Sequence, residues 1–130
     1  MSWEHFQISE GDFCNVLEKA SNELCECLYE IGTITTGKSR VFWGYQIIVY
    51  YKGIAIAGRN KGYSGTYSLA LKDLNTHMAE QGLTLLVAGN LRSYSESAMT
   101  GPAGYGYLRG NKTAVRIMST AESDSDLKAS

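Results

Sequence analysis

The sequence predicts a single α+β domain in which an N-terminal amphipathic helix and a second helix pack on a largely antiparallel sheet of about five strands. Apolar residues recur at three- and four-residue steps early in the chain, and β-branched and aromatic runs with glycine-rich turns follow. The chain has 130 residues, 44% apolar and 19% charged, which is typical of one globular domain. We expect this domain to span residues 1–120 and the polar residues 121–130 to form a flexible tail.

The first helix is predicted between Ser9 and Gly32. The Ser9 hydroxyl can cap the N-terminus, and Gly32 supplies a C-terminal stop. The apolar stripe of this helix consists of Phe13, Val16, Leu17, Ala20, Leu24, Cys27, Leu28 and Ile31. Four acidic residues lie along one flank of the predicted helix and are expected to face solvent as an acidic strip. They are Asp12, Glu23, Glu26 and Glu30.

A β-hairpin is predicted after the first helix. Residues 41–51 are rich in β-branched and aromatic side chains, and residues 54–57 are apolar. Residues 52–53 are Lys-Gly, which can make the tight turn between the two strands because glycine accepts a positive φ. Residues 58–66 are polar and rich in glycine, so they are expected to form a loop.

A second helix and three further strands complete the predicted order α-β-β-α-β-β-β. The helix is expected to begin near Thr66 or Ser68 and to end at Gln81, before Gly82. Strands are predicted at residues 83–88, 105–108 and 114–118. The first of these is almost wholly apolar, as in a central strand covered on both faces, and the other two are expected to form a hairpin.

Charge is divided unevenly along a chain whose net charge is −1. Residues 10–30 carry six acidic residues and one lysine, whereas residues 31–119 carry ten basic residues and three acidic ones. An asymmetry of this kind bears on partners and on the steering of association rather than on chemistry.

The residues do not identify a reaction, and we expect a non-enzymatic protein. His77 has Asp73 one turn away, a spacing that could orient an imidazole for a small hydrolase or transferase but is also common on helix surfaces. Cys14 has acidic neighbours that oppose a thiolate. Cys14, Cys25 and Cys27 are expected to be free thiols in a reducing cytosol, and no metal or cofactor site is predicted.

Binding functions are better supported than catalysis. Residues 58–65 follow a strand and precede a helix, where a phosphate could bind, but they lack a P-loop ending and also suit a plain connection. A basic, tyrosine-rich sheet could hold single-stranded nucleic acid. A long loop at residues 91–107 carries side chains that are common in protein interfaces. The candidate partner-binding residues on this loop are Arg92, Tyr94, Glu96, Tyr105 and Tyr107.

In size, composition and lack of a catalytic motif, the whole chain resembles the small immunity proteins of bacterial polymorphic toxin systems, including contact-dependent inhibition. The resemblance implies a single cytoplasmic domain that binds and neutralises one cognate toxin domain. The predicted acidic strip is similar to the acidic surfaces with which such proteins oppose basic toxins. A nucleic-acid-binding module is the alternative function. No run of about 18 apolar residues occurs, so no membrane partner is expected.

Overall fold

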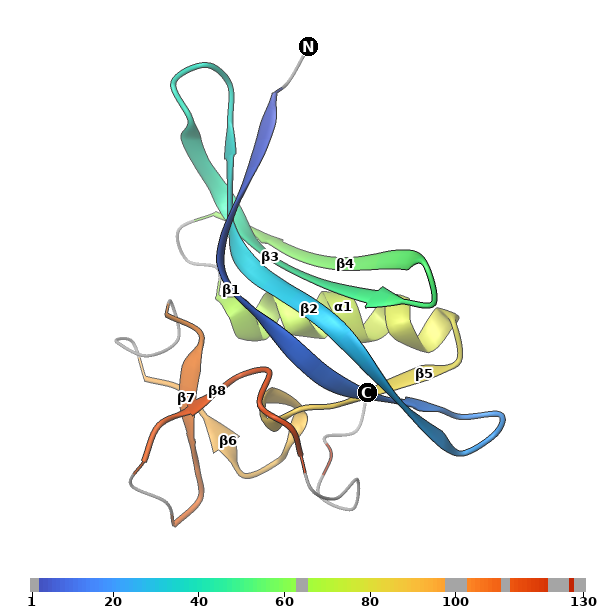
Figure 1. The fold of residues 1–130 in the computed structure, drawn as a ribbon. Helices are drawn as coiled ribbons and strands as arrows, with labels where there is room; N and C mark the ends of the chain where they lie inside the picture. Colours follow the sequence, from blue (N-terminus) through green and yellow to red (C-terminus); the bar gives the residue numbers. More distant parts are fainter. Residues whose placement is uncertain (1–2, 63–65, 98–102, 111–112, 122–126, 128–130) are drawn as a thin grey trace.

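The fold is dominated by a curled antiparallel sheet of five strands in the order β4-β3-β2-β1-β5 (Figure 1). The structure is a computed structural model that describes residues 3–62, 66–97, 103–110, 113–121 and 127. The first four strands are consecutive in the chain, and the fifth returns to pair with the first. Their bounds are Glu4–Glu18 (β1), Glu23–Thr36 (β2), Val41–Tyr51 (β3), Ile54–Lys61 (β4) and Leu83–Leu86 (β5).

The prediction of an N-terminal helix is wrong, and with it the predicted α+β class with two helices. Residues 9–32 form most of the β1–β2 hairpin. Of the described residues, 58% lie in strands and 16% in helices, with a single α-helix among them. The protein is therefore mostly β.

The hairpin forms because a short polar stretch reverses the chain in the middle of the predicted helix. Asn22 adopts a φ of 56°, a left-handed conformation that asparagine tolerates better than most residues. Its N–H donates a hydrogen bond to the carbonyl oxygen of Glu18 at 2.8 Å. The reversal places Cys14 directly opposite Cys27, and both are buried. Apolar residues on either side of the turn thus meet across two strands instead of along one helix.

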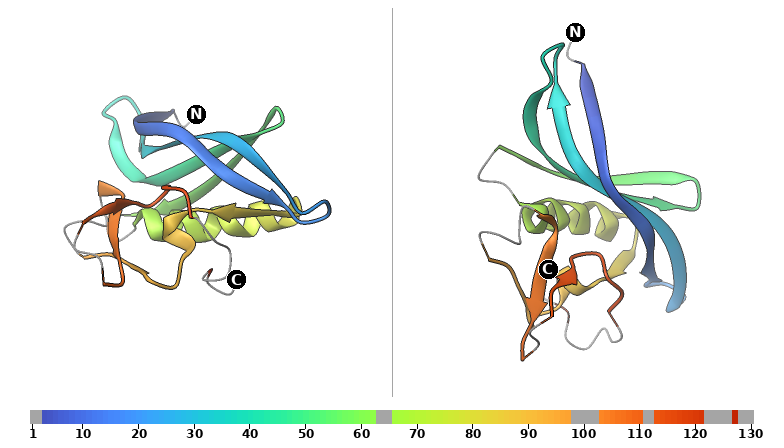
Figure 2. Two further views of the ribbon diagram at one scale, coloured as in Figure 1. Left: turned by 60° about the horizontal axis from the view of Figure 1, so that its bottom comes forward. Right: turned by 60° about the vertical axis from the view of Figure 1, so that its left-hand side comes forward.

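One α-helix, α1 (Tyr67–Glu80), lies on the concave side of the sheet (Figures 1 and 2). It occupies the segment in which the second helix was expected. The Thr66 hydroxyl accepts a hydrogen bond from the N–H of Leu69, and Gly82 follows the helix with a φ of 72°. Because α1 packs against both β4 and β5, it spans the gap between the two edges of the sheet.

The helix approaches β4 most closely at Gly58. A Cβ at this position would lie 2.3 Å from the carbonyl oxygen of Ala70 and 2.4 Å from the backbone nitrogen of Leu74. Such distances are far shorter than any ordinary contact, so only glycine permits the packing of α1 on this strand.

Residues 58–61 belong to β4 and not to the loop expected over residues 58–66. The backbone of this edge strand is partly protected by the helix, because the N–H of Arg59 donates to Oδ2 of Asp73 at 2.9 Å. Residues 63–65 of the expected loop lie outside the described part of the chain.

A small three-stranded sheet in the order β6-β7-β8 contributes to the same core. It contains the hairpin expected near the end of the chain, and a 3-10 turn, η1 (Ala88–Asn90), precedes it. Ile117 and Met118 follow the last strand and are fully buried. The strands are Tyr94–Ser95 (β6), Tyr105–Leu108 (β7) and Val115–Arg116 (β8).

The end of the described chain runs beside β5. Thr120 forms an antiparallel bridge with Val87, and the N–H of the buried Ala121 donates to the carbonyl oxygen of Leu86 at 3.0 Å. In the strand order of the large sheet β5 is the last strand, paired with β1, and is not the central strand that was predicted. Of the expected tail, residues 122–126 and 128–130 lie outside the described residues.

The two faces of the large sheet have different surroundings. α1 and the small sheet lie on its concave side, where Val16, Ile47 and Val49 are fully buried (Figure 2). Among the described elements, none is packed over the convex side of β2, β3 and β4 (Figure 2). The convex face is therefore the sheet surface that a partner can reach.

Candidate protein-docking face

A row of three exposed apolar side chains crosses the convex face. The strand register places Phe13 on β1 opposite Leu28 on β2, and Leu28 opposite Tyr50 on β3. Their exposed fractions are 53%, 50% and 39%. Directly opposite residues of antiparallel strands share a face with Cβ atoms about 5 Å apart, so the three side chains are contiguous. We call Phe13, Leu28 and Tyr50 the convex row.

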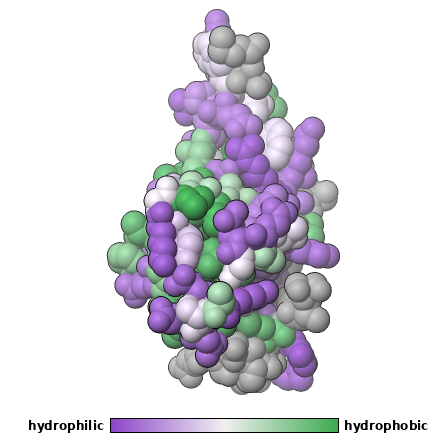
Figure 3. All heavy atoms as spheres, turned by 90° about the vertical axis from the view of Figure 1, so that its right-hand side faces the viewer, coloured by the Kyte–Doolittle hydropathy of each residue, from purple (hydrophilic) through white to green (hydrophobic). Residues whose placement is uncertain are grey.

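Strand alternation explains why these large side chains are turned to solvent. On β2, Cys27 and Tyr29 are buried, whereas Leu28 between them is half exposed. Leu24 lies on the same face of β2 and is 61% exposed. Apolar surface is visible among polar side chains over the body of the molecule, while the protruding arm at the top is mainly polar (Figure 3). Contiguous exposed apolar surface rimmed by polar residues is typical of a protein interaction site.

Two acidic side chains flank the convex row on β2. Glu26 and Glu30 stand two residues before and after Leu28, and so project from the same face. The Tyr50 hydroxyl donates a hydrogen bond to Oε1 of Glu30 at 2.5 Å, and this bond raises the pKa of Tyr50. The face therefore combines apolar side chains with two negative charges, one of them held beside the row.

The other two residues of the predicted acidic strip do not belong to this face. Asp12 pairs with Tyr29 and Glu23 pairs with Glu18, and these positions alternate with those of the convex row. Asp12 accepts a hydrogen bond from the N–H of Phe13 at 2.8 Å. The strip is divided because side chains alternate with a period of two in a strand, whereas the prediction assumed 3.6.

The residues predicted on the long loop lie apart from the convex face, since none of them comes from β1 to β4. Tyr94 is buried and its hydroxyl donates to Oε2 of Glu96 at 2.7 Å. Burial and this hydrogen bond raise the pKa of Tyr94. Arg92 is exposed, and its Nε donates to the carbonyl oxygen of Leu127 at 3.2 Å.

Tyr105 and Tyr107 both belong to β7 and are half-buried. Tyr105 pairs with Arg116 on β8, and Tyr107 pairs with Ser95 on β6. Residues 98–102 of the same predicted loop lie outside the described residues. The structure thus brings Glu26 and Glu30 together on one face but does not unite them with the candidates from the loop.

Part of the charge division along the sequence is neutralised within the fold. Three ion pairs join the acidic N-terminal strands to basic residues of the later chain. The pairs are Glu4–Arg59 (2.9 Å), Glu18–Lys52 (3.2 Å) and Glu10–Arg116 (3.6 Å). The hydrogen bond from Arg59 lowers the pKa of Glu4, and hydrogen bonds from Tyr51 and Lys52 lower that of Glu18.

The residues considered for catalysis lie on different elements and differ in solvent exposure. His77 is exposed, with Nε2 3.5 Å from Oδ1 of Asp73 and Nδ1 3.9 Å from Oε2 of Glu80. Cys14 is buried, and burial raises its pKa to about 12, so its thiol is protonated and weakly nucleophilic at neutral pH. In the described part of the chain, no group of three or more His, Cys, Asp or Glu side chains is placed to hold a metal ion.

Comparison with protein-family models, with curated proteins and with solved structures gives no match for this chain. The helix α1 is short, and no helix in the described segments has the length and apolar character needed to cross a bilayer.

The convex row was missed from sequence because Phe13 and Leu28 were assigned to the buried stripe of a helix. A signal for it was present. Cys25, Cys27, Tyr29 and Ile31 recur at every second position, a period-two apolar pattern that indicates a strand. In such a strand Leu24, Glu26, Leu28 and Glu30 lie together on the other face.

Proposed function

We propose that this protein is a protein-binding module that docks its convex face against a partner carrying apolar and basic side chains. The observation that supports this proposal is the convex row, in which three contiguous apolar side chains remain about half exposed on the uncovered face of the sheet. The finer proposal is that the protein is a cytoplasmic immunity protein whose partner is a cognate toxin domain. This finer proposal rests on the resemblance in size and composition.

The apolar side chains can supply much of the binding energy. Burying a large apolar side chain fully contributes roughly 1.5–3 kcal/mol, so the half-exposed side chains of the convex row offer about 1 kcal/mol each. Tyrosine is enriched among interface hot spots because it buries a large area with few rotatable bonds. Tyr50 is also held by Glu30, which lowers the entropy lost when a partner binds.

The acidic side chains favour a basic partner over an acidic one. Glu26 and Glu30 place negative charge at the edge of the apolar row, where it can accelerate encounter with positive charge. Charges at the rim of an interface act mainly on the association rate and its salt dependence. We therefore expect binding to a basic surface that becomes slower, but is not lost, as salt is raised.

The nucleic-acid alternative has weaker support on this sheet. Three of the basic side chains that suggested it, Lys52, Arg59 and Arg116, each lie within 4 Å of a carboxylate. The convex face itself carries acids that would repel a phosphate backbone. Gel shifts with single-stranded RNA and DNA at low salt would test this alternative, and strong retardation would favour it over protein docking.

The test is binding to the product of the neighbouring gene, co-expressed and then measured by calorimetry with purified components. Leu28→Ser should weaken binding at least tenfold because it removes the centre of the convex row. Leu69→Ser is a matched control, since Leu69 is 45% exposed but lies on α1. Equal affinities for the two variants would place the contact elsewhere, and no complex at micromolar concentration would refute the immunity proposal.

A further inference from the structure

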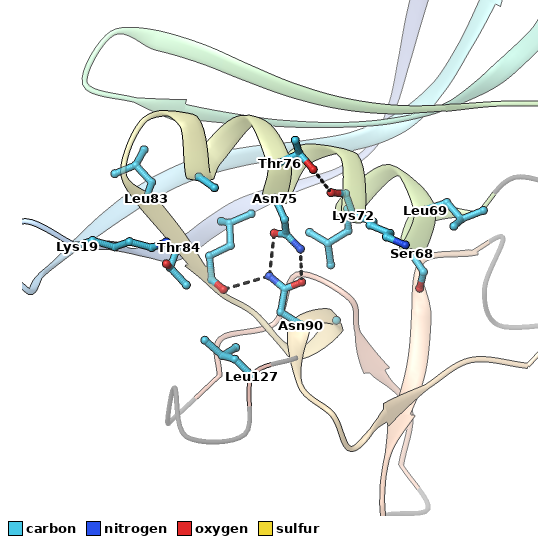
Figure 4. Close-up of a pocket in the computed structure, with 14 residues that line it drawn as sticks. Lys19, Ser68, Leu69, Lys72, Asn75, Thr76, Leu83, Thr84, Asn90 and Leu127 are labelled. Carbon is cyan, nitrogen blue, oxygen red and sulfur yellow. Dashed lines mark hydrogen bonds between the residues drawn. The ribbon is translucent and has the colours of Figure 1, made fainter. Parts of the chain in front are cut away.

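A groove of about 700 Å³ lies between α1, β5 and η1 (Figure 4). None of its lining residues comes from β2, β3 or β4, so it is separate from the convex face. Its volume is within the range of sites that hold small molecules, about 300–1,000 Å³.

The apolar part of the lining is aliphatic. Leu71, Leu83 and Leu85 are buried, with Leu69 exposed and Leu127 half-buried. No aromatic side chain is among the described residues that line the groove. The groove therefore suits a hydrocarbon chain better than a planar ring system, which would gain from stacking.

Among the described residues, the charged side chains that line the groove are positive. Lys19 and Lys72 contribute to the groove, and no Asp or Glu is among the described residues that line it. The amides of Asn75 and Asn90 satisfy one another, with Asn75 Nδ2 donating to Asn90 Oδ1 at 2.7 Å and the reciprocal bond at 3.1 Å. Asn90 Nδ2 also donates to the carbonyl oxygen of Leu85. The amide pair is thus a neutral bridge, and the lysines determine the charge of the ligand.

The two lysines lie at opposite ends of the groove. Ser68, Leu69 and Lys72 are at one end, and Lys19, Leu83 and Thr84 at the other (Figure 4). Ser68 and Lys72 are one helical turn apart, so the hydroxyl and the ammonium group share one face of α1. Ser68 is also in the first turn of α1, which contains no acidic residue to neutralise the positive end of the helix dipole.

We propose that this groove binds an aliphatic carboxylate, with its carboxylate against Ser68 and Lys72 and its hydrocarbon chain along the leucines toward Thr84. Ser68 and Lys72 match the carboxylate, and the leucines match the hydrocarbon chain. The proposal concerns a site distinct from the convex face and does not depend on the partner proposed there.

Decanoate is a suitable probe, used below its micelle concentration and followed by calorimetry and by ¹H–¹⁵N correlation spectra of the full chain. Decanol, which has the same chain length and no charge, should bind at least fivefold more weakly. Hexanoate should also bind more weakly, by up to about fourfold for each methylene removed. Amide shifts should concentrate at residues 68–76 and 83–90.

Lys72→Gln should lower the affinity for decanoate about fivefold, as expected for the loss of a solvent-exposed ion pair. Lys19→Gln should change it less than twofold, because Lys19 is at the hydrocarbon end. Lys61→Gln is the matched control, an exposed lysine at the end of β4. Decanol binding as tightly as decanoate, equal affinities for the Lys72 and Lys61 variants, or shifts confined to the convex row would overturn the proposal.

Discussion

Replacing Gly58 by alanine should push α1 away from β4 and destabilise the protein by about 3 kcal/mol. The added Cβ would lie 2.3 Å from the carbonyl oxygen of Ala70 and 2.4 Å from the backbone nitrogen of Leu74. Both atoms belong to the helix backbone, so no rotation of a side chain can relieve the contact. Insertion of one extra carbon into a packed interior costs about 1–3 kcal/mol, and the backbone contacts place this substitution at the upper end.

Equilibrium unfolding in urea, followed by circular dichroism, measures this loss. For a domain of this size, 3 kcal/mol corresponds to a fall in Tm of about 12 °C. Gly11→Ala is the control, since the nearest atom to a Cβ there is the carbonyl oxygen of Tyr29 at 3.2 Å. We expect the control to lose less than about 1 kcal/mol. A loss below about 1 kcal/mol for Gly58→Ala would show that α1 does not approach β4 closely at Gly58.

Three further predictions concern titration, thiol reactivity and the core. The pKa values of Glu4 and Glu18 are held below their usual 4.5 in the folded protein, so their contribution to stability is present above pH 4.5 and is lost as the pH falls through the lower folded values. Urea midpoints at pH 6 and pH 3 should show this loss of stability, and Arg59→Gln should make the loss smaller. An unchanged pH dependence in the Arg59→Gln variant would contradict the role of Arg59. With a disulfide reagent at pH 8, the half-buried Cys25 should react first. The buried Cys14 and Cys27 should react only on unfolding, because burial raises their pKa values to about 12. Prompt labelling of Cys14, detected by mass spectrometry, would contradict this order. Leu74→Ala removes a fully buried side chain and should cost about 2–5 kcal/mol in the same urea assay, and a cost below 1 kcal/mol would show that the core is loosely packed there.

Several elements follow from local sequence because their signals are short-range. The β-branched run of β3 and the Thr66 cap and Gly82 end of α1 are local features, and both elements lie where they were expected. The continuation of β4 to Lys61 has no such short-range signal. It depends on pairing with β3 and on the carboxylate of Asp73 from α1, neither of which adjacent residues can indicate.

The β1–β2 hairpin was mistaken for a helix because both of its faces carry apolar side chains. Cys14 and Tyr29 face the core, whereas Phe13 and Leu28 face solvent, so apolar positions fit a period of 3.6 as well as a period of two. In an ordinary half-buried hairpin the outer face would be polar and the alternation would be plain. Phe13 and Leu28, which obscured the two strands, are also two of the three members of the convex row.

Two residues of the predicted acidic strip remain on one face although the helix was wrong. Glu26 and Glu30 are four residues apart, a spacing that keeps them on one face in a helix and in a strand alike. Asp12 and Glu23 are separated from them once the period is two. The contributions of Phe13 and Tyr50 depend on cross-strand register, which one sequence without long-range pairing information does not reveal.

The position of β1 in the sheet has a consequence for the synthesis of the protein. β1 is the first strand to be made, yet its second neighbour, β5, begins 65 residues after β1 ends. At translation rates of about 5–20 residues per second, the edge of β1 at residues 15–18 waits roughly 3–13 seconds for its partner. During that interval a nascent meander of β1 to β4 has an unpaired strand edge beside the apolar Leu17. The protein is therefore most vulnerable to self-association on the ribosome, before residue 83 has emerged.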